Sequence, residues 1–95
     1  MRVRWTKRAE YRLYDGTKYI RKENPEAAKK VITAIRRVVD KIAEHPYLSP
    51  QSRAFSGFRE AVVPRYPFVI WYRVKEDEQI VEILTIWHTS QDRFR

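Results

Sequence analysis

The chain has 95 residues, 43% of them apolar and 14% aromatic, which excludes a disordered segment and predicts one small globular domain over residues 1–95. Lysine and arginine number 20 against 12 acidic residues, and the net charge of +8 favours a polyanionic partner, either nucleic acid, a nucleic-acid enzyme or an acidic protein. The absence of cysteine excludes disulfides and thiolate metal sites, and no apolar stretch suits a signal peptide or membrane span, so we expect a cytoplasmic protein with no membrane contact.

Residues 1–5 alternate between basic and apolar side chains, which is typical of a short strand with one solvated face. Thr6 is a suitable N-cap for a helix over residues 7–22, because its hydroxyl can accept a hydrogen bond from the first turn. The apolar residues of this segment form a narrow stripe. Gly16 weakens the helix interior by about 1 kcal/mol relative to alanine, so this helix depends on packing.

A second helix is predicted over residues 25–44. Asn24 supplies its N-cap, and Pro25 occupies the first helical position, where a missing N–H costs nothing. The His45-Pro46 pair ends the helix, because proline disfavours a helical conformation in the residue before it. The two helices should form an antiparallel hairpin joined by a turn of about two residues.

The rest of the chain predicts three strands. Residues 47–57 form an irregular connection whose length is typical of functional loops. A strand follows over residues 58–63. Two runs rich in β-branched and aromatic residues, 67–74 and 80–88, are separated by a polar turn and therefore form a hairpin.

The last of these strands is apolar on both faces, a pattern that indicates a central position in the sheet. Strict alternation places Val81, Ile83, Thr85 and Trp87 on one face, and Ile80, Leu84 and Ile86 with Glu82 on the other. The predicted fold is α+β with the order β-α-α-β-β-β. The last three strands form an antiparallel meander, residues 1–5 pair beside the final strand, and the helical hairpin packs on one face. The opposite face would then need a cover from outside the chain.

The order and spacing of these elements resemble the RelE/ParE superfamily of toxins from bacterial toxin–antitoxin operons. The resemblance extends over essentially the whole chain and implies the same fold. The residues that carry it are Asn24-Pro25, His45-Pro46, Gly57-Phe58-Arg59-Glu60, the run from Pro67 to Val74, Ile83-Leu84, and His88 followed by Asp92.

The resemblance implies one of two mechanisms. RelE-like toxins are ribosome-dependent endoribonucleases that cut messenger RNA, whereas ParE-like toxins lack this chemistry and bind DNA gyrase. Cleavage needs a base for the ribose 2′-hydroxyl, cations for the transition-state phosphate and an acid for the leaving oxygen. Under the RelE-like alternative the catalytic residues would be Arg59, Arg65, Arg73 and His88. The match is partial, because Val69 stands where RelE-like toxins commonly carry an active-site arginine and no tyrosine follows His88.

Structural roles remain open for the same residues. His88 can cap the last strand by bonding Thr89 or Asp92, Arg59 can form an internal ion pair, and Arg73 can pair with Glu82 across the hairpin.

The partial match favours a ParE-like toxin that acts by binding, so enzymatic activity is expected only under the RelE-like alternative. Target contacts are then expected from Arg53 in the long loop and from the C-terminal residues Arg93, Phe94 and Arg95. A third alternative is a toxin fold that has lost its toxicity. None of these alternatives requires a cofactor or a metal.

The active alternatives imply a small acidic antitoxin encoded by the adjacent gene, and a target that is either DNA gyrase or ribosome-bound messenger RNA. The antitoxin should carry a disordered C-terminal segment that folds on binding and lays an amphipathic helix on the helical hairpin. Trp5, Tyr47 and Phe55 are candidate anchors for it.

Overall fold

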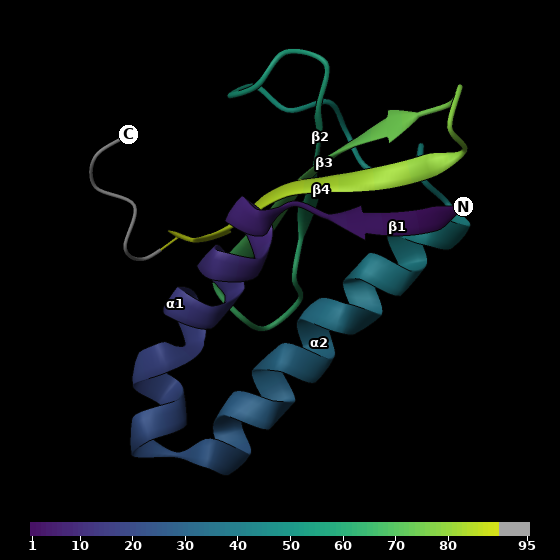
Figure 1. Cartoon of the computed structure of the whole chain (residues 1–95). Coiled ribbons are helices and arrows are strands. Elements are labelled where there is room, and N and C mark those ends of the chain that lie inside the picture. Colours follow the sequence, from purple (N-terminus) through teal and green to yellow (C-terminus); the bar gives the residue numbers. More distant parts are fainter. Residues whose placement is uncertain (90–95) are drawn as a thin grey trace.

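The computed structural model describes residues 1–89, and its elements follow the predicted β-α-α-β-β-β order (Figure 1). None of the helices in that range is long and apolar enough to cross a membrane. The elements are β1 (Arg2–Trp5), α1 (Lys7–Glu23), α2 (Pro25–Glu44), β2 (Arg59–Val62), β3 (Phe68–Lys75) and β4 (Ile80–His88).

The four strands form one mixed sheet in the order β1-β4-β3-β2. β4 is therefore central, as its apolar pattern predicted. β2, β3 and β4 form the predicted antiparallel meander, but β1 pairs with β4 in the parallel direction, with Arg2 opposite Ile80 and Trp5 opposite Ile83. A parallel neighbour requires a long crossover connection, which the two helices help to supply.

Side-chain caps fix the limits of the helical hairpin. Thr6 caps α1 by accepting a hydrogen bond from the backbone N–H of Ala9 at 3.0 Å. Asn24 ends α1 and starts α2, because its N–H donates to the carbonyl of Ile20 at 2.7 Å and its side chain accepts from the N–H of Ala27 at 3.1 Å. The turn is thus this one residue, shorter than the two that the sequence predicted.

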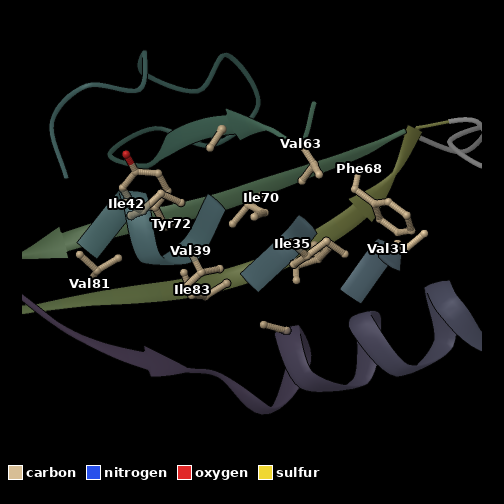
Figure 2. Packing of buried hydrophobic residues seen from close by; sticks show 13 residues of the cluster. Val31, Ile35, Val39, Ile42, Val63, Phe68, Ile70, Tyr72, Val81 and Ile83 are labelled. Carbon is tan, nitrogen blue, oxygen red and sulfur yellow. The ribbon is translucent and has the colours of Figure 1, made fainter. Parts of the chain in front are cut away.

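Both helices lie on the same side of the sheet (Figure 1). The buried stripe of α2 points toward the buried side chains of the central strands, and Figure 2 shows the two sets packed together. Burying these side chains is the main favourable contribution to folding, at about 1.5–3 kcal/mol for each large aliphatic or aromatic residue. The labelled residues of this core are Val31, Ile35, Val39, Ile42, Val63, Phe68, Ile70, Tyr72, Val81 and Ile83.

A β-bulge in β4 changes the predicted division of its faces. Tyr72 pairs with Ile83 but Trp71 pairs with Thr85, so Leu84 is an extra residue between two paired positions. A bulge reverses the alternation of side chains beyond it. Ile86 therefore lies opposite the buried Ile70 and joins the helix-covered side, which strict alternation from Val81 and Ile83 had not predicted.

Gly16 provides room for a core side chain. A Cβ built at this position would lie 3.2 Å from Cε1 of Phe68, a ring that is almost fully buried and packs edge-on against His88. Alanine at position 16 gains about 1 kcal/mol of helix propensity but crowds this ring, and overpacking costs about 1–3 kcal/mol. We therefore expect Gly16→Ala to lower the free energy of unfolding slightly, measured by urea denaturation. Asp15→Ala, at an exposed position of the same helix, should raise it by a few tenths of a kcal/mol.

Candidate functional site

The face of the sheet opposite the helices carries an aromatic cluster. Phe55 packs edge-on against Trp71, with ring centroids 5.1 Å apart, and Trp71 lies 6.2 Å from Trp87. Phe58 extends the cluster beside Phe55 at 6.3 Å, and the indole N–H of Trp71 donates to Glu60 at 2.8 Å. Because Phe55 and Phe58 belong to the connection between α2 and β2, the chain itself covers part of this face. The expectation that the face opposite the helices is covered only from outside the chain was therefore wrong for this part of the face.

Glu82 is the centre of an ionic network on the same face. Its carboxylate accepts from Arg73 at 2.8 Å and from Arg4 at 3.1 Å, and Arg4 also contacts Glu78 at 3.2 Å. Burial alone would raise the pKa of Glu82, but the hydrogen bonds and positive charges of the two arginines outweigh it, so its pKa is lowered. The Arg73–Glu82 pair predicted from the hairpin is confirmed. The guanidinium of Arg73 also lies 5.3 Å from the centroid of the Phe58 ring.

Glu82→Gln is expected to lower the free energy of unfolding by about 1–2 kcal/mol near neutral pH, because the glutamine keeps the shape but loses the negative charge and one of the two acceptor oxygens. The Glu82 side chain is 14% exposed, whereas those of Arg4 and Arg73 are 46% and 42% exposed, and solvent screening limits the loss to this range. Urea denaturation of both proteins measures the difference.

The difference in free energy of unfolding between the wild-type chain and Glu82→Gln should depend on pH. Because the folded pKa of Glu82 is below its ordinary value of 4.5, its stabilising contribution is complete above about that pH and is lost as the pH falls through the folded pKa. The difference between the two proteins should therefore shrink in acid. Glu26→Gln is the control, since Glu26 forms an exposed pair with Lys29 at 3.7 Å that should contribute little at any pH. A loss for Glu82→Gln that does not change with pH would contradict the ionic explanation.

The four residues proposed for RNA cleavage fall into two groups. Arg65 lies in the turn before β3, and His88 pairs with Phe68 at the start of β3, so both belong to one end of the sheet. Arg73 lies five residues along β3, roughly 16 Å away at 3.3 Å per residue. Arg59 pairs with Tyr72, so these two side chains lie on the same face of the sheet. Arg73 follows Tyr72, and successive side chains of a strand point to opposite faces, so Arg59 and Arg73 lie on opposite faces. The four side chains do not surround one position.

Arg59 and its neighbours anchor the long connection to the sheet. Arg59 donates to the carbonyl of Ser49 at 2.7 Å and lies over the ring of Tyr47, so it is bonded to the loop instead of to Glu60. Tyr47 donates to Glu76, and this hydrogen bond raises the pKa of the Tyr47 hydroxyl. The buried Tyr72 donates to the carbonyl of Pro46 at 2.8 Å. The start of the connection is thereby bound to β2, to β3 and to the turn that follows β3.

His88 packs edge-on against Phe68, with ring centroids 4.8 Å apart. Burial lowers the pKa of His88, and a hydrogen bond with its own backbone offsets this only in part. The imidazole is therefore biased toward its neutral form.

The residues expected to contact a target are distributed differently. Arg53 is exposed in the connection between α2 and β2. Arg93, Phe94 and Arg95, together with Asp92, lie outside the described residues. Within residues 1–89 no group of three or more His, Cys, Asp or Glu side chains is placed to hold a metal ion.

An apolar groove lies between β1 and the two helices. Its volume is about 480 Å³, and its walls include Trp5 of β1, Leu13 of α1 and Val39 of α2, each packed into or against the core. Charged side chains lie at its rim. Of the three anchors predicted from the sequence, Trp5 is in this groove. Its residues are Val3, Trp5, Glu10, Leu13, Arg36, Val39 and Asp40.

A second groove lies between α2 and the β2–β3 turn, with a volume of about 660 Å³. We call it the basic groove, and its cations are Lys29, Lys30, Arg37, Lys41 and Arg65. Sequence reasoning singled out only Arg65. The sequence of α2 could have revealed this groove. Positions 29, 33, 37 and 41 lie four residues apart, and three of these positions are basic, so the helix presents its cations in one row.

Comparison with known proteins agrees with this fold. A chain of the chromosomal ParDE toxin–antitoxin system from P. aeruginosa superposes with a TM-score of 0.74 and 27% identity, covering 93% of this chain and 95% of that chain. The toxin–antitoxin complex RelBE2 from Mycobacterium tuberculosis contains a chain with a TM-score of 0.62 and 22% identity, covering 92% of this chain and 88% of that one, a likeness that shows the fold alone. The architecture is therefore that of the RelE/ParE superfamily.

Sequence comparison identifies the branch of this superfamily. Residues 3–93 match the family described as ParE toxin of type II toxin-antitoxin system, parDE. Y4kP of Sinorhizobium fredii (strain NBRC 101917 / NGR234), named as a candidate toxin, is 42% identical over 90 residues, which cover 95% of this chain and 90% of that protein. The chain belongs to the ParE toxin family of type II toxin–antitoxin systems.

Proposed function

We propose that this ParE-family toxin acts by binding DNA gyrase and trapping its cleaved DNA complex, without cleaving RNA itself. Arg53 and the C-terminal residues Arg93, Phe94 and Arg95 supply contacts to the target. A cognate antitoxin, encoded by the adjacent gene, neutralises the toxin.

The arrangement of the four candidate cleavage residues carries this proposal. General acid–base catalysis requires its groups within about 2.6–3.2 Å of the atoms that they protonate or deprotonate in one bound substrate. Here Arg59 is bonded to the loop, Arg73 is bonded to Glu82, and Arg65 and His88 lie toward the other end of β3. Such an arrangement favours action by binding.

Two assays in parallel test the proposal. Purified toxin is added to a gyrase supercoiling and cleavage reaction, and separately to translating ribosomes that are analysed by toeprinting. Inhibited supercoiling with accumulated cleaved DNA, at concentrations that leave the message intact, is the expected result. Codon-positioned cuts in ribosome-bound message, with gyrase unaffected, would establish the RelE-like alternative. A protein inactive in both assays would fit the third alternative, a fold that has lost its toxicity.

The C-terminal contacts can be tested in the gyrase assay. The triple variant Arg93→Ala, Phe94→Ala, Arg95→Ala is expected to lose most of its inhibition, because arginine and aromatic residues dominate binding energy at protein interfaces. The control is Arg8→Ala with Lys18→Ala, two exposed basic positions on α1 that lose the same net charge. Equal inhibition by the triple variant and the wild-type chain would show that the C-terminal residues do not contribute to target binding.

The apolar groove is the proposed site for an antitoxin helix. Its apolar walls and charged rim match the apolar and polar faces of an amphipathic helix, the common mode of helix-in-groove recognition. The net charge of +8 attracts an acidic polypeptide. Affinity should therefore fall between low and high salt, because salt screens interactions between exposed charges. An affinity independent of salt would contradict the electrostatic part of this proposal.

A further inference from the structure

The basic groove concentrates positive charge on one side of the molecule. All five of its cationic side chains belong to exposed residues, and the only carboxylate among its lining residues is that of Glu26. Glu26 lies 3.7 Å from Lys29, and both side chains are more than three-quarters exposed. No carboxylate of residues 1–89 lies within ion-pair distance of Lys30, Arg37, Lys41 or Arg65.

This arrangement opposes folding. Arg37 and Lys41 are four residues apart on α2, a spacing at which like charges destabilise a helix by about 0.2–0.5 kcal/mol. Arg4 and Arg73, by contrast, each form an ion pair with Glu82. Five cations around one groove, four of them without a carboxylate partner in residues 1–89, are better explained by an anionic ligand than by the fold.

The backbone at Arg65 also favours a binding role. Its φ is 73°, in the left-handed region that residues other than glycine, asparagine and aspartate rarely adopt. Hydrogen bonds on both sides of it hold the turn, from the N–H of Tyr66 to the carbonyl of Val63 and from the N–H of Phe68 to the carbonyl of Tyr66. Strain of this kind is characteristic of functional positions. In this turn Arg65 lines the groove across from α2.

The lining distinguishes nucleic acid from polypeptide as the ligand. Protein interfaces usually contain a large apolar or aromatic anchor at a core depleted of charge, whereas five of the eleven residues that line this groove are cationic. Its floor is formed by the small Ala34, the half-buried Val38 and Tyr66. Nucleic-acid interfaces are more polar and much more positively charged. The apolar groove, by contrast, has the walls that a polypeptide requires.

We propose that the basic groove binds the phosphate backbone of duplex DNA. The row from Lys29 to Lys41 is roughly 18 Å long at 1.5 Å per residue, which equals the rise of about five base pairs along the duplex axis at 3.4 Å each. Arg65 contacts the backbone from the other side of the groove, and the hydroxyl of Thr33 donates a hydrogen bond to a phosphate oxygen. Binding is independent of base sequence, because these contacts reach only phosphates. The site goes beyond the proposed function, since it operates on DNA with or without gyrase.

Fluorescence anisotropy with a labelled duplex of about 20 base pairs, titrated with the chain at several salt concentrations, tests the proposal. The variant is Arg37→Glu with Lys41→Glu. The control is Arg8→Glu with Lys18→Glu, at exposed positions of α1 outside the groove, which gives the same net charge. Circular dichroism establishes that each variant is folded.

The wild-type chain should bind with a slope of log affinity against log salt of about −3 to −4, as four phosphate contacts require. The groove variant should bind at least tenfold more weakly and lose about two units of slope, whereas the control should stay within about threefold of the wild type. Equal losses in the two variants would show diffuse attraction by net charge and overturn the proposal. So would the absence of binding at low salt.

An acidic polypeptide is the competing ligand. Poly-glutamate with the charge of the duplex is titrated against the same proteins. We expect it to bind more weakly than DNA and to distinguish little between groove variant and control. If poly-glutamate binds as tightly as the duplex, and if this binding is lost in the groove variant but not in the control, the groove selects acidic protein and the DNA assignment fails.

Discussion

Phe68→Ala is expected to lower the free energy of unfolding by about 3–5 kcal/mol, the range measured for removing a large aromatic side chain from a core. Phe68 is 1% exposed and lies between α1, α2 and the end of β4, where it contacts the position of Gly16 and the ring of His88. Gly16 has no side chain that could fill the space. A domain of this size is stable by only about 5–15 kcal/mol, so the loss is a large fraction of the total. Urea denaturation measures it.

Val62→Ala is the matched control for this variant. Val62 is in the same sheet but 66% exposed, so its truncation should change stability by less than about 0.5 kcal/mol. A loss below about 1 kcal/mol for Phe68→Ala would mean that the helices close over the space, and would contradict the packing described for this core.

The same variant should change the titration of His88. Burial lowers the pKa of His88, and the Phe68 ring packs edge-on against it. Removing the ring should therefore return this pKa toward its ordinary value of 6.5. A histidine with a lowered folded pKa stabilises the fold above its unfolded pKa, and this contribution is lost as the pH falls below it toward the folded pKa. The chain has two histidines, and NMR separates their signals. An unchanged His88 titration in Phe68→Ala would assign its burial to other residues.

The elements were predictable because local chemistry determines them. Asn24 and Pro25 mark a helix start in any context, and the apolar content of residues 80–88 requires a central strand. The bulge at Leu84 was not predictable, because the same residues satisfy strict alternation and the reversed alternation equally well. Only the pairing with Trp71 and Tyr72 selects between them, and this information is not in the strand itself.

The surfaces were less predictable than the core. Leu13 belongs to the apolar stripe predicted for the first helix, but a stripe does not reveal which of its residues border a groove. Arg59 and Arg73 have the residue type of catalytic cations, yet the positions of Ser49 and Glu82 determine that they are bonded within the chain. Residue type predicts what a side chain can do, whereas its partners determine whether it is available.

Leu13→Glu is expected to weaken antitoxin binding at least a hundredfold, provided that the antitoxin helix occupies the apolar groove. Leu13 is half-buried against Trp5 and Val39 in the groove walls. Once a helix covers it, a carboxylate at this position would be desolvated among the apolar walls of the groove, at a cost of several kcal/mol. A hundredfold loss needs only about 2.7 kcal/mol. Isothermal titration with the cognate antitoxin measures the affinity.

Growth assays separate this effect from unfolding. Cells that express Leu13→Glu with the antitoxin should stop growing, because the toxin remains active while its neutralisation fails. An unfolded toxin would instead leave growth normal. Tyr11→Glu introduces the same charge on the same helix at a residue that is 61% exposed and does not line the groove, so its neutralisation should match the wild type. Normal affinity for Leu13→Glu, or equal losses in both variants, would place the antitoxin helix elsewhere on the toxin.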